Sequence, residues 1–158
     1  REGLACITAE DTRWARCDIK SVALLANVML RQKAVDAGAS ETILLRDGEL
    51  MEASASTVLV VRDGVLLAPP KTHLMLPGIT YDVILELAEQ HQQPLVVREI
   101  TETELRSADE VWMTSSTKEI LAITTLDGQP VGSGQPGPYA EQMWQWYQDF
   151  KNTVMRKG

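Results

Sequence analysis

The sequence has few of the residues from which disulfide frameworks and metal sites are built. Its 158 residues include two cysteines, Cys6 and Cys17, and two histidines, His73 and His91. Both kinds of framework need more ligands at closer spacing. We therefore expect no metal site and two reduced thiols, which predicts a cytoplasmic protein.

Long apolar runs and clusters of positive charge are also missing. The longest apolar runs, residues 22–26 and 57–61, are far shorter than the ~20 residues that a membrane span needs. The 15 Lys and Arg residues stand against 22 Asp and Glu, and the net charge is -7. Proteins that bind nucleic acid instead carry a positive surface. The sequence thus predicts no membrane contact and no nucleic-acid partner.

The apolar content, by contrast, is sufficient for one globular domain. Apolar residues make up 44% of the chain, enough to bury a continuous core. The chain begins at Arg1 without a Met, and residues 1–13 have the character of an interdomain linker that leads into a strand. We expect residues 14–158 to form the domain, with a further segment missing upstream.

Turn signals divide much of the chain into short strands. The Asp-Gly pairs at 47–48 and 63–64 supply the positive φ angles of tight hairpin turns. The pair at 127–128 ends the last strand, and the Gly-, Pro- and Ser-rich residues 128–138 are expected to form a loop. Apolar or β-branched runs predict strands at 41–46, 50–52, 57–62, 65–68, 95–100, 111–114 and 120–126.

Helical spacing and capping signals predict four helices between these strands. They are expected from an N-cap at Ser21 to Gly38, from Gly78 to about Gln90, after a capping box at 101–104, and over 139–155. Mixed strands and helices with several hairpins favour a mixed α/β (α+β) fold over a doubly wound parallel sheet.

Four segments carry side chains suited to chemistry: residues 13–20, 52–57, 76–80 and 114–117. Each is weak evidence by itself, because an isolated lysine or glutamate is usually a solvated surface charge. Hydroxyl side chains at a strand end usually satisfy a turn. The argument for a site therefore depends on the four segments together.

Together these segments contain the groups that a pyridoxal-phosphate site requires. Lys20 offers an amine for the cofactor aldehyde. Glu52 offers a carboxylate that would keep the pyridine nitrogen protonated. Ile79 and Thr80, at a predicted helix N-terminus, and the hydroxyl groups of Ser115 and Ser116 could bind the phosphate.

These motifs resemble those of class IV aminotransferases, most closely the D-amino-acid aminotransferases. The resemblance rests on Arg-Cys-Asp-Ile-Lys-Ser at 16–21, Glu-Ala-Ser-Ala-Ser-Thr-Val at 52–58 and Leu-Pro-Gly-Ile-Thr at 76–80, in the family's order and spacing. It implies the large C-terminal domain of such an enzyme, a mixed sheet or pseudo-barrel with flanking helices.

The resemblance also assigns roles to individual residues. By it, Lys20 is the Schiff-base lysine and Glu52 is the partner of the pyridine nitrogen. Arg13 matches a family arginine near the cofactor. The phosphate ligands are implied to be Ile79, Thr80, Ser115 and Ser116. Relatives carry Gly at the position of Ala53 and often Asn at that of Thr57, which puts the fine placement of this loop in doubt.

By the same resemblance, the enzyme is a homodimer that transfers an amino group between a D-amino acid and a 2-oxo acid. A smaller N-terminal domain, absent from this chain, supplies an arginine to the cofactor phosphate and most substrate contacts. We therefore expect residues 14–158 to be the cofactor-binding C-terminal domain, inactive when alone.

Three alternatives remain open. An aminodeoxychorismate lyase or a branched-chain amino-acid aminotransferase of the same superfamily would show the same lysine, glutamate and phosphate-binding groups. From a different class, the chain could be a catalytically inert domain that serves protein contacts.

Overall fold

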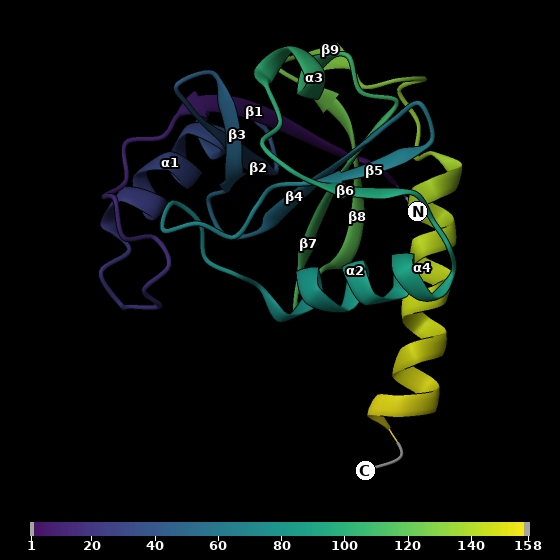
Figure 1. Ribbon diagram of the computed structural model, residues 1–158. Coiled ribbons are helices and arrows are strands. Elements are labelled where there is room, and N and C mark those ends of the chain that lie inside the picture. Colours follow the sequence, from purple (N-terminus) through teal and green to yellow (C-terminus); the bar gives the residue numbers. More distant parts are fainter. Residues whose placement is uncertain (1, 157–158) are drawn as a thin grey trace.

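The structure, a computed structural model, describes residues 2–156 and shows the expected mixed α/β fold (Figure 1). Its strands are β1 Leu4–Glu10, β2 Glu41–Arg46, β3 Glu49–Ala53, β4 Thr57–Arg62, β5 Val65–Ala68, β6 Leu95–Val97, β7 Glu110–Ser115, β8 Glu119–Leu126 and β9 Gln129–Pro130. Its helices are α1 Leu25–Asp36, α2 Ile79–Gln90, α3 Glu102–Arg106 and α4 Pro138–Phe150, and a π-helix over Lys151–Met155 follows α4.

All of these strands belong to one curled, mixed sheet. The strand order is β3-β2-β1-β8-β7-β4-β5-β6, and β9 pairs with β8. Strand β1 runs parallel to both of its neighbours, β2 and β8, whereas β7 is antiparallel to β8 and β4. The segment expected to lead into the domain therefore supplies a strand that is paired on both edges.

The two predicted Asp-Gly hairpins are confirmed, and Asp127-Gly128 forms a third, to the short strand β9 in the segment expected to be a loop. In each turn both residues have positive φ, between 49° and 77°. The flanking residues pair across two-residue turns, as Arg46 does with Glu49, Arg62 with Val65, and Leu126 with Gln129. Local turn chemistry thus fixes the register of the strands that these turns connect.

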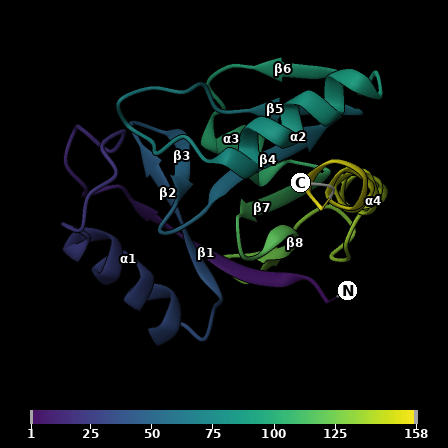
Figure 2. The ribbon, with the colours of Figure 1, turned by 90° about the horizontal axis from the view of Figure 1, so that it is seen from below.

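The sheet buries apolar side chains on both faces. Along β4, Val58 and Val60 belong to one apolar cluster, which α3 covers with Leu105. The alternate residues Leu59 and Val61 face a second cluster, covered by α2 and α4. Figures 1 and 2 show α2 and α4 together, with α1 at the opposite end of the molecule. Because side chains on both faces of the sheet are buried, the strand sequences are continuous apolar runs and do not alternate between apolar and polar residues.

Helix α4 is fixed to the sheet by Glu110 of β7. One carboxylate oxygen accepts a hydrogen bond from the backbone N–H of Tyr139 at 2.9 Å, and the other from that of Ala140 at 2.8 Å. The indole N–H of Trp112 donates to the same carboxylate at 2.9 Å. A Cβ at Gly137 would lie 2.1 Å from Glu110 Oε1. The close approach therefore requires glycine before this helix.

One predicted helix start and one predicted strand end are wrong. Ser21 does not cap α1, which begins at Leu25 after an N-cap at Leu24. The Ser21 hydroxyl instead accepts from the Ala23 N–H at 3.2 Å, a local bond that competes with helix formation. The final helix, expected over 139–155, does extend to Met155, but it is a π-helix after Phe150.

The strand expected over 95–100 ends at Val97. Ile100, the last residue of the expected strand, lies instead in the apolar cluster that contains Val58 and Val60. There its carbonyl accepts from the Leu50 N–H at 2.8 Å and its side chain is buried.

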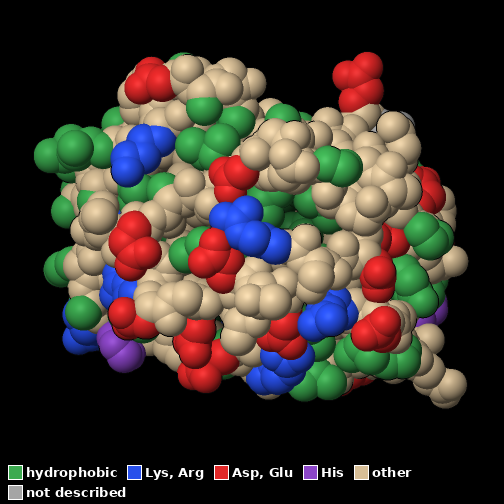
Figure 3. Space-filling view, turned by 90° about the horizontal axis from the view of Figure 1, so that it is seen from above, with side chains coloured by type: hydrophobic (Ala, Val, Ile, Leu, Met, Phe, Trp, Pro, Cys, Tyr) green, Lys and Arg blue, Asp and Glu red, His purple; other side chains and the backbone are tan. Residues whose placement is uncertain are grey.

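The surface carries mixed charge on the face drawn in Figure 3, where acidic and basic side chains are interspersed. Within residues 2–156, no helix combines the length and the apolar character that crossing a bilayer requires.

Candidate active site

An open cleft of about 700 Å³ lies between α1, the loop before it, and the N-terminus of α2. The β3–β4 connection and the end of β7 complete its wall. All seven predicted site residues line this cleft: Arg13, Lys20, Glu52, Ile79, Thr80, Ser115 and Ser116. The fold therefore brings together groups from four separate segments of the sequence.

Lys20 lies in the loop between β1 and α1, not directly before a capped helix as expected. Local bonds shape this loop, including an ion pair between Arg16 and Asp18 at 3.0 Å and a hydrogen bond from the Asp18 N–H to the His73 carbonyl at 3.4 Å. Among the described residues, no hydrogen bond or ion pair engages the Lys20 amine. It is available to a ligand in the cleft.

Cys17 belongs to the same loop and lines the same cleft. Its thiol is buried and donates to the Trp14 carbonyl at 3.1 Å. Burial raises the pKa of this thiol, which keeps it protonated near neutral pH.

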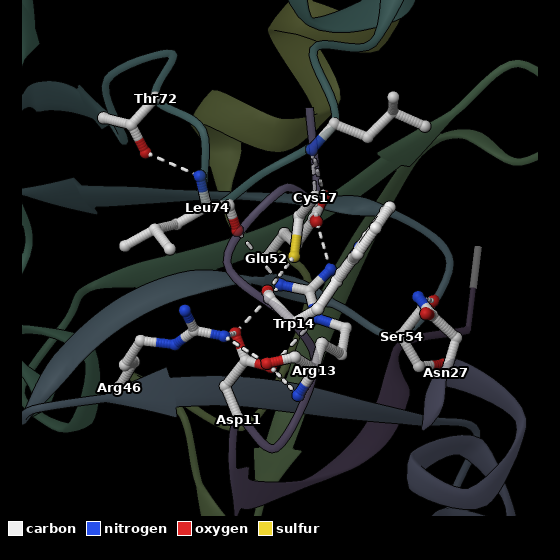
Figure 4. Close-up of polar contacts among 11 residues, drawn as sticks. Asp11, Arg13, Trp14, Cys17, Asn27, Arg46, Glu52, Ser54, Thr72 and Leu74 are labelled. Atoms are coloured by element: carbon white, nitrogen blue, oxygen red, sulfur yellow. Dashed lines mark hydrogen bonds and ion pairs between the residues drawn. The ribbon is translucent and has the colours of Figure 1, made fainter. Parts of the chain in front are cut away.

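Arg13 connects two buried carboxylates. Its Nη1 donates to Glu52, while its Nε and Nη2 donate to Asp11 at 2.9 and 3.0 Å. Arg46 adds a second guanidinium to Asp11 at 3.0 Å. Figure 4 shows Arg13 between the two acids, with Arg46 on the far side of Asp11. Two acids and two arginines therefore form a charge-balanced group beneath the cleft.

Glu52 is held in place at the edge of this group. Burial raises the pKa of its carboxyl above the ordinary value, and the hydrogen bond from Arg13 opposes that rise. The Leu76 N–H also donates to the carboxylate, at 3.2 Å. The carboxylate is thus oriented by the protein, as a partner for a cationic ring nitrogen has to be.

Another part of the cleft is suited to an anion. Helix α2 begins at an N-cap, Gly78, that offers no side-chain cap to its first turn. Ser115 Oγ accepts from the Lys118 N–H at 3.1 Å and shares a second hydrogen bond with Thr117 Oγ1 at 3.4 Å, in which either hydroxyl can donate. Backbone N–H groups at a helix N-terminus together with hydroxyl donors form a phosphate-binding arrangement.

Several cleft residues were given no role by the sequence analysis. Asn27 of α1 donates to the Ser54 carbonyl at 2.8 Å and ties the helix to the β3–β4 connection. Thr57 and Thr114 lie directly opposite each other on β4 and β7. Strand alternation could have placed each threonine on a face, but only the pairing register brings the two together.

The comparisons with known proteins agree on one family. The profile of amino-transferase class IV matches residues 1–126. A D-alanine aminotransferase of Bacillus licheniformis is 46% identical over 143 residues, which are 90% of this chain and 50% of that protein. One from Listeria monocytogenes serotype 1/2a (strain 10403S) is 44% identical over 146 residues, 92% of this chain and 50% of that protein.

A solved structure shows the same likeness. The branched-chain aminotransferase of the thermophilic archaeon Thermoproteus uzoniensis, solved with norvaline, superposes with a TM-score of 0.87 at 28% identity. The match covers 99% of this chain and 54% of that one. The chain spans about half the length of the curated relatives it matches.

Proposed function

We propose that this chain, which belongs to the amino-transferase class IV family, is the cofactor-binding part of a pyridoxal-phosphate-dependent aminotransferase. The observation that carries the proposal is the single cleft that gathers Lys20, Glu52 and the α2 N-terminus. We infer a D-amino acid and a 2-oxo acid as substrates, because a D-alanine aminotransferase shares 46% identity with the chain. We further propose that the enzyme is a cytoplasmic homodimer.

The described residues fit the three reactive parts of pyridoxal phosphate. The free amine of Lys20 suits the aldehyde, and the oriented carboxylate of Glu52 suits the pyridine nitrogen. The uncapped start of α2, with Ile79 and Thr80, suits the phosphate. Ser115 and Ser116 add hydroxyl groups at the same end. When bound, pyridoxal phosphate withdraws electrons from the reacting carbon of the amino acid.

Each side chain then has a distinct task. Lys20 Nζ would be the point of covalent attachment for the cofactor aldehyde and, as a free amine, would serve as the general acid and base that moves a proton at the reacting carbon. Glu52 holds a proton on the ring nitrogen, which maintains electron withdrawal. Arg13 is a positioning residue, since its guanidinium is committed to Glu52 and Asp11. Ser115, Ser116 and the α2 N-terminus fix the orientation of the ring through the phosphate.

The first prediction tests Lys20. Borohydride reduction in the presence of pyridoxal phosphate should attach the cofactor to Lys20, mapped by peptide mass spectrometry on the complete gene product. Lys20→Ala should remove the adduct and all measurable transamination, because no other described lysine lines the cleft. Lys33→Ala, in the second half of α1, is the matched control and should retain both. An adduct on a different lysine would refute the assignment.

A further inference from the structure

Thr114 carries a hydroxyl group that the described chain leaves without a partner. Its Oγ1 is buried, the residue is 2% exposed, and no hydrogen bond reaches this atom among residues 2–156. A buried hydroxyl without a partner is costly, and most such groups in native proteins are satisfied. Thr114 also lines the cleft. A ligand in the cleft could therefore supply the missing partner.

The position of Thr114 indicates which part of a ligand it would meet. It pairs with Thr57 across β4 and β7, and strand alternation places it on the same face as Trp112, toward α2. Thr57 Oγ1 is 3.4 Å from the position that a Cβ on Gly78 would occupy. The two threonines thus lie beneath the first residues of α2, and Ser115 follows Thr114 in the chain.

We infer that Thr114 is a further cofactor-binding residue, whose hydroxyl donates a hydrogen bond to the phosphate end of the cofactor. The inference rests on the proposed function. A phosphate oxygen is an acceptor, and the hydroxyl has a proton to donate. In this account the unmatched hydroxyl costs stability in the empty cleft and gains its partner when the phosphate arrives.

The test compares two ligands that differ only in the phosphate group, on the complete gene product in buffer free of phosphate. Thr114→Val keeps the side-chain shape and removes the hydroxyl. Its affinity for pyridoxal phosphate should fall about 10- to 100-fold, as expected for one hydrogen bond to a charged group. Its affinity for pyridoxal should not change. Thr114→Ser should restore tight binding.

Thermal unfolding of the ligand-free protein provides a second readout. Thr114→Val should unfold at the same temperature as the wild type or higher, because it removes an unsatisfied buried hydroxyl. Thr42 is the matched control, since it is also buried in a strand but donates to the Leu30 carbonyl at 2.6 Å. Thr42→Val should lower the unfolding temperature and leave both affinities unchanged.

The outcomes separate this inference from the proposed function. Wild-type binding of pyridoxal phosphate with equal binding by Thr114→Val would overturn the inference alone. So would an equal loss of affinity for both ligands, which would indicate altered packing. Failure of the wild-type protein to bind pyridoxal phosphate, or to form a Lys20 adduct, would overturn both.

Discussion

At the scale of single residues, the protein's own contacts orient the groups of the site. Glu52 receives hydrogen bonds from Arg13 and from the Leu76 N–H, so its carboxylate cannot turn freely. Arg13 is itself fixed by two bonds to Asp11. A group held in this way needs no reorganisation when charge develops beside it.

The second prediction follows from this arrangement. Glu52→Gln keeps the size of the side chain but removes its charge, which lowers the pKa of a neighbouring pyridinium nitrogen and weakens electron withdrawal. We expect cofactor binding to persist while kcat falls by about 100-fold or more. Absorbance titration and steady-state kinetics on the complete gene product measure the two quantities separately.

A matched variant controls for the loss of one acidic charge. Glu99→Gln changes an exposed glutamate outside the cleft and should leave kcat unaltered. Full activity in Glu52→Gln would remove Glu52 from the proposed chemistry.

At the scale of elements, signals that act over a few residues were readable from the sequence. The capping box before α3 is confirmed: Thr101 Oγ1 accepts from the Glu104 N–H at 3.2 Å, and the Glu104 carboxylate accepts from the Thr101 N–H at 3.0 Å. Arg98 adds a further hydrogen bond to Glu104 at 2.7 Å. The bonds from Arg98 and Thr101 lower the pKa of Glu104 to about 2.

The third prediction uses this lowered pKa. Between the ordinary value of 4.5 and about 2, the unfolded chain takes up a proton at Glu104 that the folded chain does not. The contribution of Glu104 to stability is therefore present at neutral pH and lost as the pH falls through this window. We expect Glu104→Gln to lower the unfolding temperature at pH 7, because it weakens the ion pair with Arg98.

Urea unfolding at a series of pH values checks the sign of this effect. The difference between wild type and Glu104→Gln should shrink from pH 5 toward pH 2. A difference that stays constant over this range would show that the charge of Glu104 does not stabilise the fold.

Features that depend on distant parts of the chain were not readable in the same way. The hairpins follow from Asp-Gly pairs, but the insertion of β1 between β2 and β8 depends on pairings with segments far along the chain. Ser21 is a short-range exception, since a local hydrogen bond from the Ala23 N–H, and not a distant contact, occupies its hydroxyl.

The candidate site shows the same division. Lys20, Glu52 and the start of α2 could be proposed from motifs, and their presence in one cleft is a result of the fold. Two features could not be predicted from the sequence: the hydrogen bonds from Arg13 to Asp11, and the lack of a hydrogen-bond partner for the Thr114 hydroxyl among the described residues. Each depends on which groups the fold brings within hydrogen-bonding distance.

At the scale of the whole molecule, the wall of the cleft continues into an exposed apolar surface. This surface comprises Ile19 and Val22 of the loop and Leu25, Val28 and Met29 of α1. Val22 is 99% exposed, and α1 buries only Leu30 and Ala34 among its residues. Several exposed apolar side chains on one short segment commonly mark a contact with another protein surface.

The fourth prediction is that the 158-residue chain self-associates through this apolar surface. Leu25→Gln with Met29→Gln, about one helical turn apart, should reduce association because it places polar groups on the exposed face. Sedimentation velocity over a range of protein concentrations measures the effect. Val97→Gln, on strand β6, also replaces an exposed apolar residue and should leave association unchanged. Wild-type chain that stays monomeric at high concentration would contradict the prediction.

The two thiols lie in different parts of the fold, so each reports on a different motion. Cys6 is in a strand paired on both edges, and burial raises the pKa of its thiol to about 12. Cys17 is in the loop that borders the cleft. Because only an accessible thiolate reacts quickly with alkylating reagents, the rate of modification at Cys17 follows the opening of the loop. The rate at Cys6 follows the separation of the sheet itself, so one reagent distinguishes motion at the cleft from loss of the fold.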